Sequence, residues 1–205
     1  MAQVTERRGA GEAEITVNEA AFAAGVTVKS VNQAIDRDQI ASRLLRRATD
    51  RAKRGVEPSD AVYLAVRQVI APDLWPELYR SFRHKVLAQI PRRLKVRSVV
   101  LDLEGTIGEV EERLNLLRKL RERVVIDPEI RAGEPVFRGT RTPVFGIARK
   151  IELGATIEEL KEDHPQLADD DFELATQYAR LYPRRGRPRA DSRRGPSRGG
   201  SAAEP

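Results

Sequence analysis

Asp127-Pro-Glu-Ile-Arg-Ala-Gly-Glu-Pro-Val-Phe-Arg-Gly-Thr-Arg-Thr-Pro-Val144 is the stretch that decides how the C-terminal part of this 205-residue chain folds. Each of its three prolines fixes its own φ at about −65° and pushes the preceding residue towards extended geometry. Its two glycines supply the positive φ that tight turns often need. These residues are Pro128, Pro135, Pro143, Gly133 and Gly139. The stretch therefore predicts a small β-turn element around Val136-Phe137 that leads into a helix beginning near Val144.

Apolar residues recur at helical spacing from Val144 to Tyr182 and predict three helices in series. The first helix ends at a turn formed by Gly154, and Thr156 caps the second. Asp169 or Asp170 caps the third. The apolar positions are Ile147, Ala148, Ile151, Ile157, Leu160, Phe172, Ala175, Tyr178, Ala179 and Leu181. We therefore expect a compact helical unit over residues 124–182.

The residues of this unit resemble a small bacterial antitoxin domain, the family known as domain of unknown function 433. The resemblance rests on Asp127-Pro128, Gly133-x-Pro135, Gly139-Thr140-Arg141, Pro143-Val144, Ile147-Ala148, Gly154-Ala155, Glu159-Leu160, Asp163-His164-Pro165, Ala175 and Tyr178-Ala179. It implies a winged-helix-like or tri-helical antitoxin domain in a VapB-like antitoxin of a type II toxin–antitoxin pair. The toxins of such pairs resemble PIN-domain ribonucleases, whose acidic pocket holds a divalent metal.

The second helix of this unit carries Glu158, Glu159, Glu162 and Asp163. A helix with that surface repels phosphates, so we expect it to contact protein, either a second copy of the chain or a toxin. In the turn before the helices, Arg138 and Arg141 are the side chains that we expect to be free for toxin contact.

Residues Val17 to Ile35 predict a helix-turn-helix near the N-terminus. Gly25 permits a left-handed turn between the helices, Thr27 caps the second one, and small Ala21 facing Val31 allows the helices to approach closely. Ala20, Ala21 and Ala24 line the first helix, while Val28, Val31, Ala34 and Ile35 form the inner face of the second. The alternative is a helical hairpin with a polar outer face.

The outer side of the second helix carries residue types that recognise DNA. Asn and Gln side chains pair with adenine, and Lys or Arg reaches guanine or phosphate. A basic segment from Arg43 to Arg54 follows and forms a wing or an extra helix that grips the DNA backbone. The predicted DNA-binding residues are Thr27, Lys29, Ser30, Asn32, Gln33, Arg37, Arg43, Arg46 and Arg47. Longer members of the antitoxin family carry similar N-terminal regions.

Residues 56–123 connect the two units. Ser59 or Asp60 caps one helix, Pro72 opens another that runs through Leu87, and Leu94 to Leu101 look like a strand. Thr106 caps a longer helix whose stripe forms either core or a dimer seam. The stripe consists of Ile107, Val110, Leu114, Leu117, Leu120 and Val124.

The chain ends in an arginine-rich tail over residues 183–205, which holds too few apolar residues to fold alone. Its Arg185-Gly186-Arg187-Pro188 string looks like an AT-hook core that lies in a minor groove. Alternatively, its guanidinium groups pair with toxin carboxylates, or the tail is solvated and has no role. The predicted toxin-binding residues here are Arg184, Arg185, Arg187 and Arg189.

Composition gives no indication of an enzyme. The chain has no cysteine and two distant histidines, so no disulfide, thiolate nucleophile or metal site is predicted. Val99 to Thr106 resembles the nucleophile loop of haloacid-dehalogenase-like phosphatases, but Glu104 stands where a second Asp belongs, and the remaining residues cannot build a parallel α/β sheet. With no long apolar run and no signal-peptide pattern, a cytoplasmic protein is expected.

The sequence therefore predicts a mainly α protein with small β elements. Its expected parts are a loose arm (1–14), a helix-turn-helix with basic extension (15–55), a connecting and dimerisation region (56–123), an antitoxin domain (124–182) and the tail (183–205). We expect an antitoxin without catalytic residues, cofactor or metal that neutralises a PIN-like ribonuclease toxin and binds its own operator as double-stranded DNA. It would act as a homodimer or a toxin–antitoxin hetero-oligomer. The alternative is a transcriptional regulator with no toxin partner.

Overall fold

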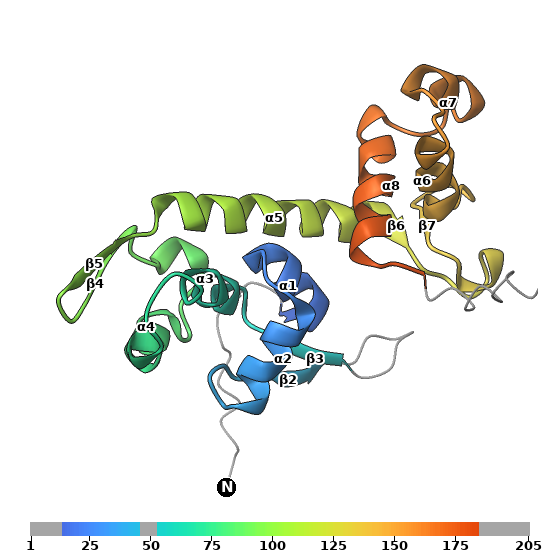
Figure 1. The fold of residues 1–205 in the computed structure, drawn as a ribbon. Helices are drawn as coiled ribbons and strands as arrows, with labels where there is room; N and C mark the ends of the chain where they lie inside the picture. Colours follow the sequence, from blue (N-terminus) through green and yellow to red (C-terminus); the bar gives the residue numbers. More distant parts are fainter. Residues whose placement is uncertain (1–13, 46–52, 185–205) are drawn as a thin grey trace, which may run out of the picture.

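The computed structural model describes residues 14–45 and 53–184, and this part of the chain is mainly helical with small β-sheets (Figure 1). The expected fold class, mainly α with small β elements, is confirmed at that level. The helices are α1 (Val17–Ala24), α2 (Val28–Asp36), α3 (Pro58–Val66), α4 (Trp75–Phe82), α5 (Glu104–Arg123), α6 (Val144–Glu152), α7 (Ile157–Asp163) and α8 (Asp169–Leu181). Short 3-10 turns are η1 (Pro72–Leu74), η2 (Leu87–Gln89) and η3 (Arg131–Gly133). No described helix has the length and apolar composition needed to cross a membrane.

Three small antiparallel sheets accompany the helices. β1 (Ile15–Thr16), β3 (Lys53–Val56) and β2 (Arg43–Leu45) pair in that order. β4 (Arg93–Val96) pairs with β5 (Val99–Asp102), and β6 (Val124–Val125) with β7 (Val136–Phe137). The described ends of the basic segment are thus strands and not an extra helix. The single strand expected from Leu94 to Leu101 is wrong, because Arg97 adopts a positive φ of 51° and folds the segment into a hairpin.

Both units of the described structure pack against the long helix α5 (Figure 1). At 20 residues it is about 30 Å long. An N-terminal unit, comprising α1–α4 and their strands, packs along its first part, and a C-terminal unit of α6–α8 packs at its far end. The apolar stripe of α5 serves both cores. Ile107, Val110, Leu114 and Leu117 belong to the N-terminal core, whereas Leu120 belongs to the C-terminal core. In this chain the stripe is therefore core.

Two of the predicted helix caps are confirmed and three are wrong. The hydroxyls of Thr27 and Thr156 accept the backbone N–H groups of Ser30 and Glu159, at 3.1 and 3.2 Å. The three wrong predictions are Ser59 or Asp60, Thr106, and Asp169 or Asp170, because the helices begin after Glu57, Leu103 and Ala168. Asp60 and Asp171 instead lie three residues inside their helices and accept N–H bonds from Glu57 and Ala168, at 3.0 and 2.9 Å.

The helix expected from Pro72 to Leu87 is shorter than predicted. Pro72–Leu74 forms a 3-10 turn, the α-helix spans Trp75–Phe82, and a second 3-10 turn begins at Leu87. The chain leaves the helix at Arg83, whose ψ is 130°, and His84 then adopts a positive φ of 60°. The buried residues of the N-terminal core nevertheless include Leu78, Phe82 and Leu87, so the apolar pattern predicted their burial correctly.

Candidate functional site

Helices α1 and α2 form a tight pair around Gly25. Gly25 lies in the left-handed region at φ 66°, and the next residue, Val26, donates its N–H to Ala21 O at 2.9 Å. A β-carbon at Gly25 would lie 3.1 Å from a guanidinium nitrogen of Arg113, so both the φ and the space favour glycine. Ala21 and Val31 are both buried between the helices. The expected close approach of the two helices is present.

The outer face of α2 divides the predicted DNA-binding residues into two groups. Lys29, Gln33 and Arg37 are exposed. Ser30 is half-buried, and its hydroxyl and carbonyl both accept hydrogen bonds from Arg67, at 2.9 and 3.0 Å. Asn32 is also half-buried, and its amide donates to Val28 O at 3.2 Å. The α2 residues that present unobstructed polar groups to solvent are therefore Lys29, Gln33 and Arg37, with the exposed cap Thr27 at the start of the helix.

Arg67, a buried arginine that sequence analysis did not identify, bonds α2 from the core side. The Arg67 side chain bonds Ser30, donates to Gln39 Oε1 at 2.8 Å, and lies 5.3 Å from the Trp75 ring centroid. Such neutral oxygens and an aromatic face compensate a guanidinium withdrawn from water. Arg67, at the end of α3, therefore holds α2 in place relative to α3. Only a tertiary contact reveals this role, because Arg67 follows α3 in sequence and gives no pattern of its own.

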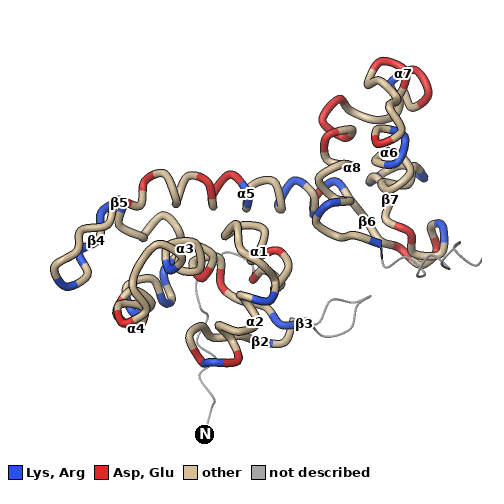
Figure 2. The backbone as a smooth tube through the Cα atoms, viewed as in Figure 1, with Lys and Arg blue, Asp and Glu red and all other residues tan. Residues whose placement is uncertain are grey.

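The β2–β3 ribbon lies beside α2 and adds cationic side chains (Figures 1 and 2). Arg43, Lys53 and Arg54 are exposed on it, and Arg54 bonds Asp36 at the end of α2 at 2.7 Å. Arg43 lies 3.6 Å from the Glu14 carboxylate. The predicted residues Arg46 and Arg47 fall outside the described residues. This surface, Lys29, Gln33, Arg37 and the ribbon cations, is called the α2 face below.

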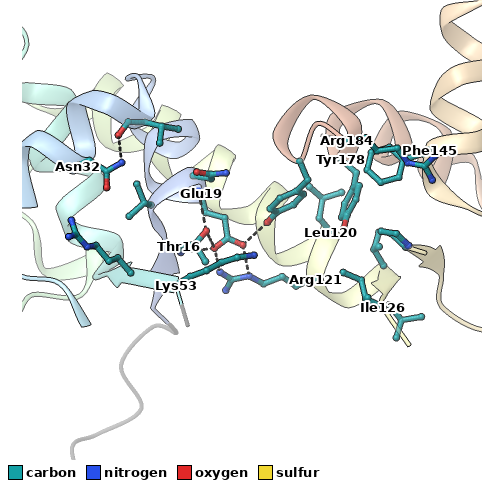
Figure 3. Close-up of a pocket in the computed structure, with 18 residues that line it drawn as sticks. Thr16, Glu19, Asn32, Lys53, Leu120, Arg121, Ile126, Phe145, Tyr178 and Arg184 are labelled. Atoms are coloured by element: carbon teal, nitrogen blue, oxygen red, sulfur yellow. Dashed lines mark hydrogen bonds and ion pairs between the residues drawn. The ribbon is translucent and has the colours of Figure 1, made fainter. Parts of the chain in front are cut away.

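A pocket of about 980 Å³ separates the N-terminal unit from the C-terminal unit (Figure 3). We call it the inter-unit pocket. Its N-terminal wall comes from the start of α1, from α2 and from β3, and its C-terminal wall comes from β6, α6 and the end of α8. The end of α5 forms its floor through Leu120 and Arg121. Sequence reasoning did not predict this pocket, because its walls are distant in the chain.

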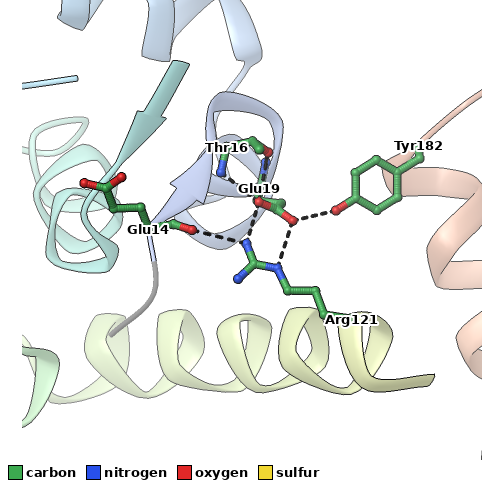
Figure 4. Close-up of polar contacts among 5 residues, drawn as sticks. All are labelled: Glu14, Thr16, Glu19, Arg121 and Tyr182. Atoms are coloured by element: carbon green, nitrogen blue, oxygen red, sulfur yellow. Dashed lines mark hydrogen bonds and ion pairs between the residues drawn. The ribbon is translucent and has the colours of Figure 1, made fainter. Parts of the chain in front are cut away.

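Glu19 at the edge of the pocket joins the two units (Figure 4). Its side chain has no solvent exposure and accepts hydrogen bonds from Thr16 N at 2.7 Å, Arg121 Nη2 at 2.7 Å and Tyr182 Oη at 2.7 Å. Burial by itself would raise the pKa of Glu19, but the bonds from Arg121, Thr16 and Tyr182 together outweigh it and hold the pKa below its ordinary value. The Thr16-x-x-Glu19 spacing can be recognised in the sequence as a capping box. The bonds that Glu19 accepts from Arg121 and Tyr182 cannot be predicted from the sequence.

An aromatic series runs from α6 to the end of α8 on the opposite wall. The rings of Phe145 and Tyr178 lie 5.6 Å apart edge to face, and those of Tyr178 and Tyr182 lie 4.8 Å apart. The Arg184 guanidinium lies 4.5 Å from the Phe145 centroid and donates to Glu134. Burial, followed by the nearby Glu19 carboxylate, raises the pKa of Tyr182, so its hydroxyl remains a donor. Arg184, predicted to bind toxin, is thus held at the pocket; Arg185, Arg187 and Arg189 lie outside the described residues.

The turn that contains Gly139 is built as expected, with Val136 and Phe137 fully buried and Gly139 at φ 77°. The expectation that Arg138 is free is wrong, because its Nε donates to Glu122 O at 2.6 Å and anchors the turn to α5. Arg141 is exposed and makes no ion pair with the rest of the described chain. A second clamp on α5 is the paired bond from Arg123 to buried Asp171, at 2.6 and 2.5 Å.

Most residues of α7 are acidic (Figure 2). Glu158, Glu159 and Glu162 are exposed, and Asp163 pairs with Lys150 at 2.9 Å. That pairing lowers the pKa of Asp163. Within residues 14–45 and 53–184 there is no cluster of three or more His, Asp or Glu side chains arranged to hold a metal ion.

A family model described as protein of unknown function DUF433 matches residues 124–179. The chain carries a DUF433 domain. Uncharacterized protein y4eO of Sinorhizobium fredii is 38% identical over 91 residues. That alignment covers 44% of this chain and 41% of the relative, so the chain spans well under half the length of the curated relative it matches.

Two solved structures are similar to parts of the chain. A DUF433 member protein from Anabaena variabilis is 29% identical, with a TM-score of 0.30, and the match covers 37% of this chain and 75% of that chain. Rv2018 from Mycobacterium tuberculosis is 15% identical, with a TM-score of 0.36, and the match covers 79% and 96% of the two chains. Both TM-scores are too low to assign the fold of the whole chain.

Proposed function

We propose that this protein is an antitoxin that binds its own operator DNA through the α2 face and neutralises a PIN-like ribonuclease toxin through its C-terminal part. Inhibition is stoichiometric occlusion, so the chain performs no catalysis. The single observation that supports DNA binding most is the α2 face itself. A capped helix presents Lys29, Gln33 and Arg37 to solvent beside a ribbon that carries further cations.

The division of charge between the two units supports two separate partners. The α2 face is rich in cations and amides, whereas the exposed surface of α7 is anionic and would repel a phosphate backbone. The DUF433 domain is therefore assigned to protein contact. In this proposal the helix-turn-helix is α1 and α2, the β2–β3 ribbon acts as its wing, and the protein functions in the cytoplasm. Dimerisation follows because one helix reads too few base pairs for operator selectivity.

A gel-shift assay with the promoter region of its own operon tests the DNA arm. The double variant Gln33→Ala and Arg37→Ala removes two of the exposed polar side chains of the α2 face, and we expect selective retention of the operator fragment over random duplex to be lost. Gln68→Ala and Lys119→Ala, which change an exposed glutamine elsewhere in the N-terminal unit and an exposed cationic residue on α5, are the matched controls. Unchanged selectivity in the double variant would contradict the assignment of the α2 face.

Co-expression with a PIN-like protein encoded beside this chain tests the antitoxin arm. We expect the chain to restore growth of cells that express the toxin and to co-purify with it. A chain that retains its operator but neither rescues growth nor forms a complex would instead be a transcriptional regulator whose DUF433 domain has another role. The two arms are therefore tested separately.

A further inference from the structure

The inter-unit pocket leaves apolar side chains open to water on both of its walls. Val28 contributes from α2 and is 41% exposed, although it was expected on the inner face of that helix. Ile126, which follows β6 on the other wall, is 47% exposed. Val124 and Val125 beside it are half-buried. Soluble chains rarely leave apolar residues facing one another across a concave surface unless something covers them.

Cationic side chains surround this apolar surface. Lys53 and Arg54 line the N-terminal wall, Arg184 lines the C-terminal wall, and Arg121 lies at the floor. Glu19 is the one acidic residue among those that line the pocket in the described part of the chain, and Arg121 compensates it. The side chains of Arg54 and Arg184 remain about half exposed even though each has an internal acidic partner. The pocket thus combines exposed apolar side chains on both walls with cationic side chains.

We infer that the inter-unit pocket is the docking site for a segment of the toxin that carries apolar side chains flanked by carboxylates. The inference rests on the proposed function and places toxin contact here and not at Arg138 or on the tail alone. A phosphate backbone would gain nothing from Val28 and Ile126, whereas an amphipathic protein segment would bury both. The cationic lining favours a segment with carboxylates over the arginine-rich sequence of residues 185–205.

Docking in this pocket would also explain its composition. Desolvated aromatic and arginine side chains account for much of the affinity at protein interfaces, and Phe145, Tyr182 and Arg184 are such residues. Carboxylates of the toxin would bind Arg54 and Arg184 in exchange for the exposed partner Asp36 and the half-buried partner Glu134. Tyr182 and Arg184 lie within three residues of position 185. A toxin segment in the pocket would therefore contact the chain next to the arginine-rich sequence.

The test uses the full chain and the purified PIN-like protein encoded beside it, with affinity measured by calorimetry. Ile126→Glu replaces an exposed apolar side chain of the C-terminal wall by a carboxylate, and Val28→Glu does the same on the opposite wall. We expect each to weaken the complex by about tenfold or more. Leu153→Glu is the matched control, because Leu153 is 70% exposed at the end of α6 and away from the pocket. It should change affinity by less than about twofold.

Each other outcome has a distinct meaning. If the wild-type chain forms no complex, the proposed function fails and this inference fails with it. If the wild type binds but both pocket variants bind as tightly as Leu153→Glu, the inference alone is overturned. A loss of operator retention in Ile126→Glu with toxin affinity unchanged would identify DNA as the occupant. Weaker self-association in sedimentation, again with toxin affinity unchanged, would identify a second copy. Circular dichroism confirms that each variant is folded, and agreement between variants on two different units excludes a local defect.

Discussion

Glu19 and Asp60 are both buried carboxylates, but their pKa values are shifted in opposite directions. Glu19 keeps its charge because Arg121 and Tyr182 bond it, and its pKa is held low. Asp60 is 3% exposed and receives one backbone N–H bond, with Glu57 nearby. Burial, with the repulsion from Glu57, therefore raises the pKa of Asp60 to about 7. The difference follows from whether a guanidinium lies within reach.

Asp60→Asn should make the chain more stable at pH 8 than the wild type. Because the folded-state pKa of Asp60 is raised, its contribution to stability is complete below its unfolded pKa and is lost as the pH rises through about 7. Asparagine keeps the acceptor for Glu57 N–H and cannot ionise. We expect a gain on the order of 2–4 kcal/mol at pH 8 and little difference at pH 4, measured by urea denaturation. Asp38→Asn, at an exposed position, is the control; a gain equal at both pH values would refute the explanation.

Tyr182→Phe should destabilise the chain more than Tyr79→Phe does. Tyr182 donates to a buried carboxylate, whereas Tyr79 accepts a bond from the Ala41 backbone N–H in a partly exposed position. Hydrogen bonds to charged groups are about twice as strong as neutral ones. We expect losses of about 2 and 1 kcal/mol in the free energy of unfolding, measured by chemical denaturation. Equal losses would mean that the Glu19 bond is not charge-assisted.

At the scale of elements, the sequence predicted what local chemistry decides. Gly25 and Gly139 adopt the positive φ expected of them, and Thr27 and Thr156 cap their helices. Two of the three wrong caps share one cause, because in α3 and α8 an acidic side chain three residues inside the helix, Asp60 or Asp171, bonds back to the cap residue.

What the sequence could not predict was set by contacts between elements. The inner-face pattern of α2 placed Val28 in the core, but the C-terminal unit leaves that position at the open pocket. Ser30 has a residue type suited to DNA contact, yet Arg67 already bonds it. Both residues face neighbours that are distant in sequence, and no periodicity within α2 contains that information.

Two substitutions on α5 should destabilise different halves of the molecule. Leu117 packs in the N-terminal core and Leu120, one turn later, in the C-terminal core. Replacing either by alanine leaves a cavity that costs about 2–5 kcal/mol. In hydrogen exchange, Leu120→Ala should lower protection in α6 and α8 and spare α3, and Leu117→Ala should do the reverse. Equal loss of protection in both units by either variant would show that α5 couples them into a single cooperative core.

At the scale of the whole molecule, the two units meet through few direct contacts. Apart from α5, which both cores share, Leu181 of α8 packs against both cores. The Glu19–Tyr182 bond links α1 directly to the end of α8, and Arg121 supports it from α5. This small polar link lies at the edge of the inter-unit pocket, so the width of the pocket depends on it. Any change in the angle between the units would move Val28 and Ile126 relative to each other.

Breaking the link from one side should therefore open the molecule, and removing both charges should largely restore it. Arg121→Leu removes the guanidinium that donates to buried Glu19 from two nitrogens, and breaking a buried ion pair from one side costs about 3–5 kcal/mol. Water then enters to hydrate Glu19, and the radius of gyration measured by small-angle X-ray scattering should increase. The double variant Glu19→Gln and Arg121→Leu removes both members of this ion pair, so its stability and radius should lie closer to the wild type than those of Arg121→Leu. Losses that simply add in the double variant would show that Glu19 and Arg121 stabilise the molecule independently and that the pair does not hold the two units together.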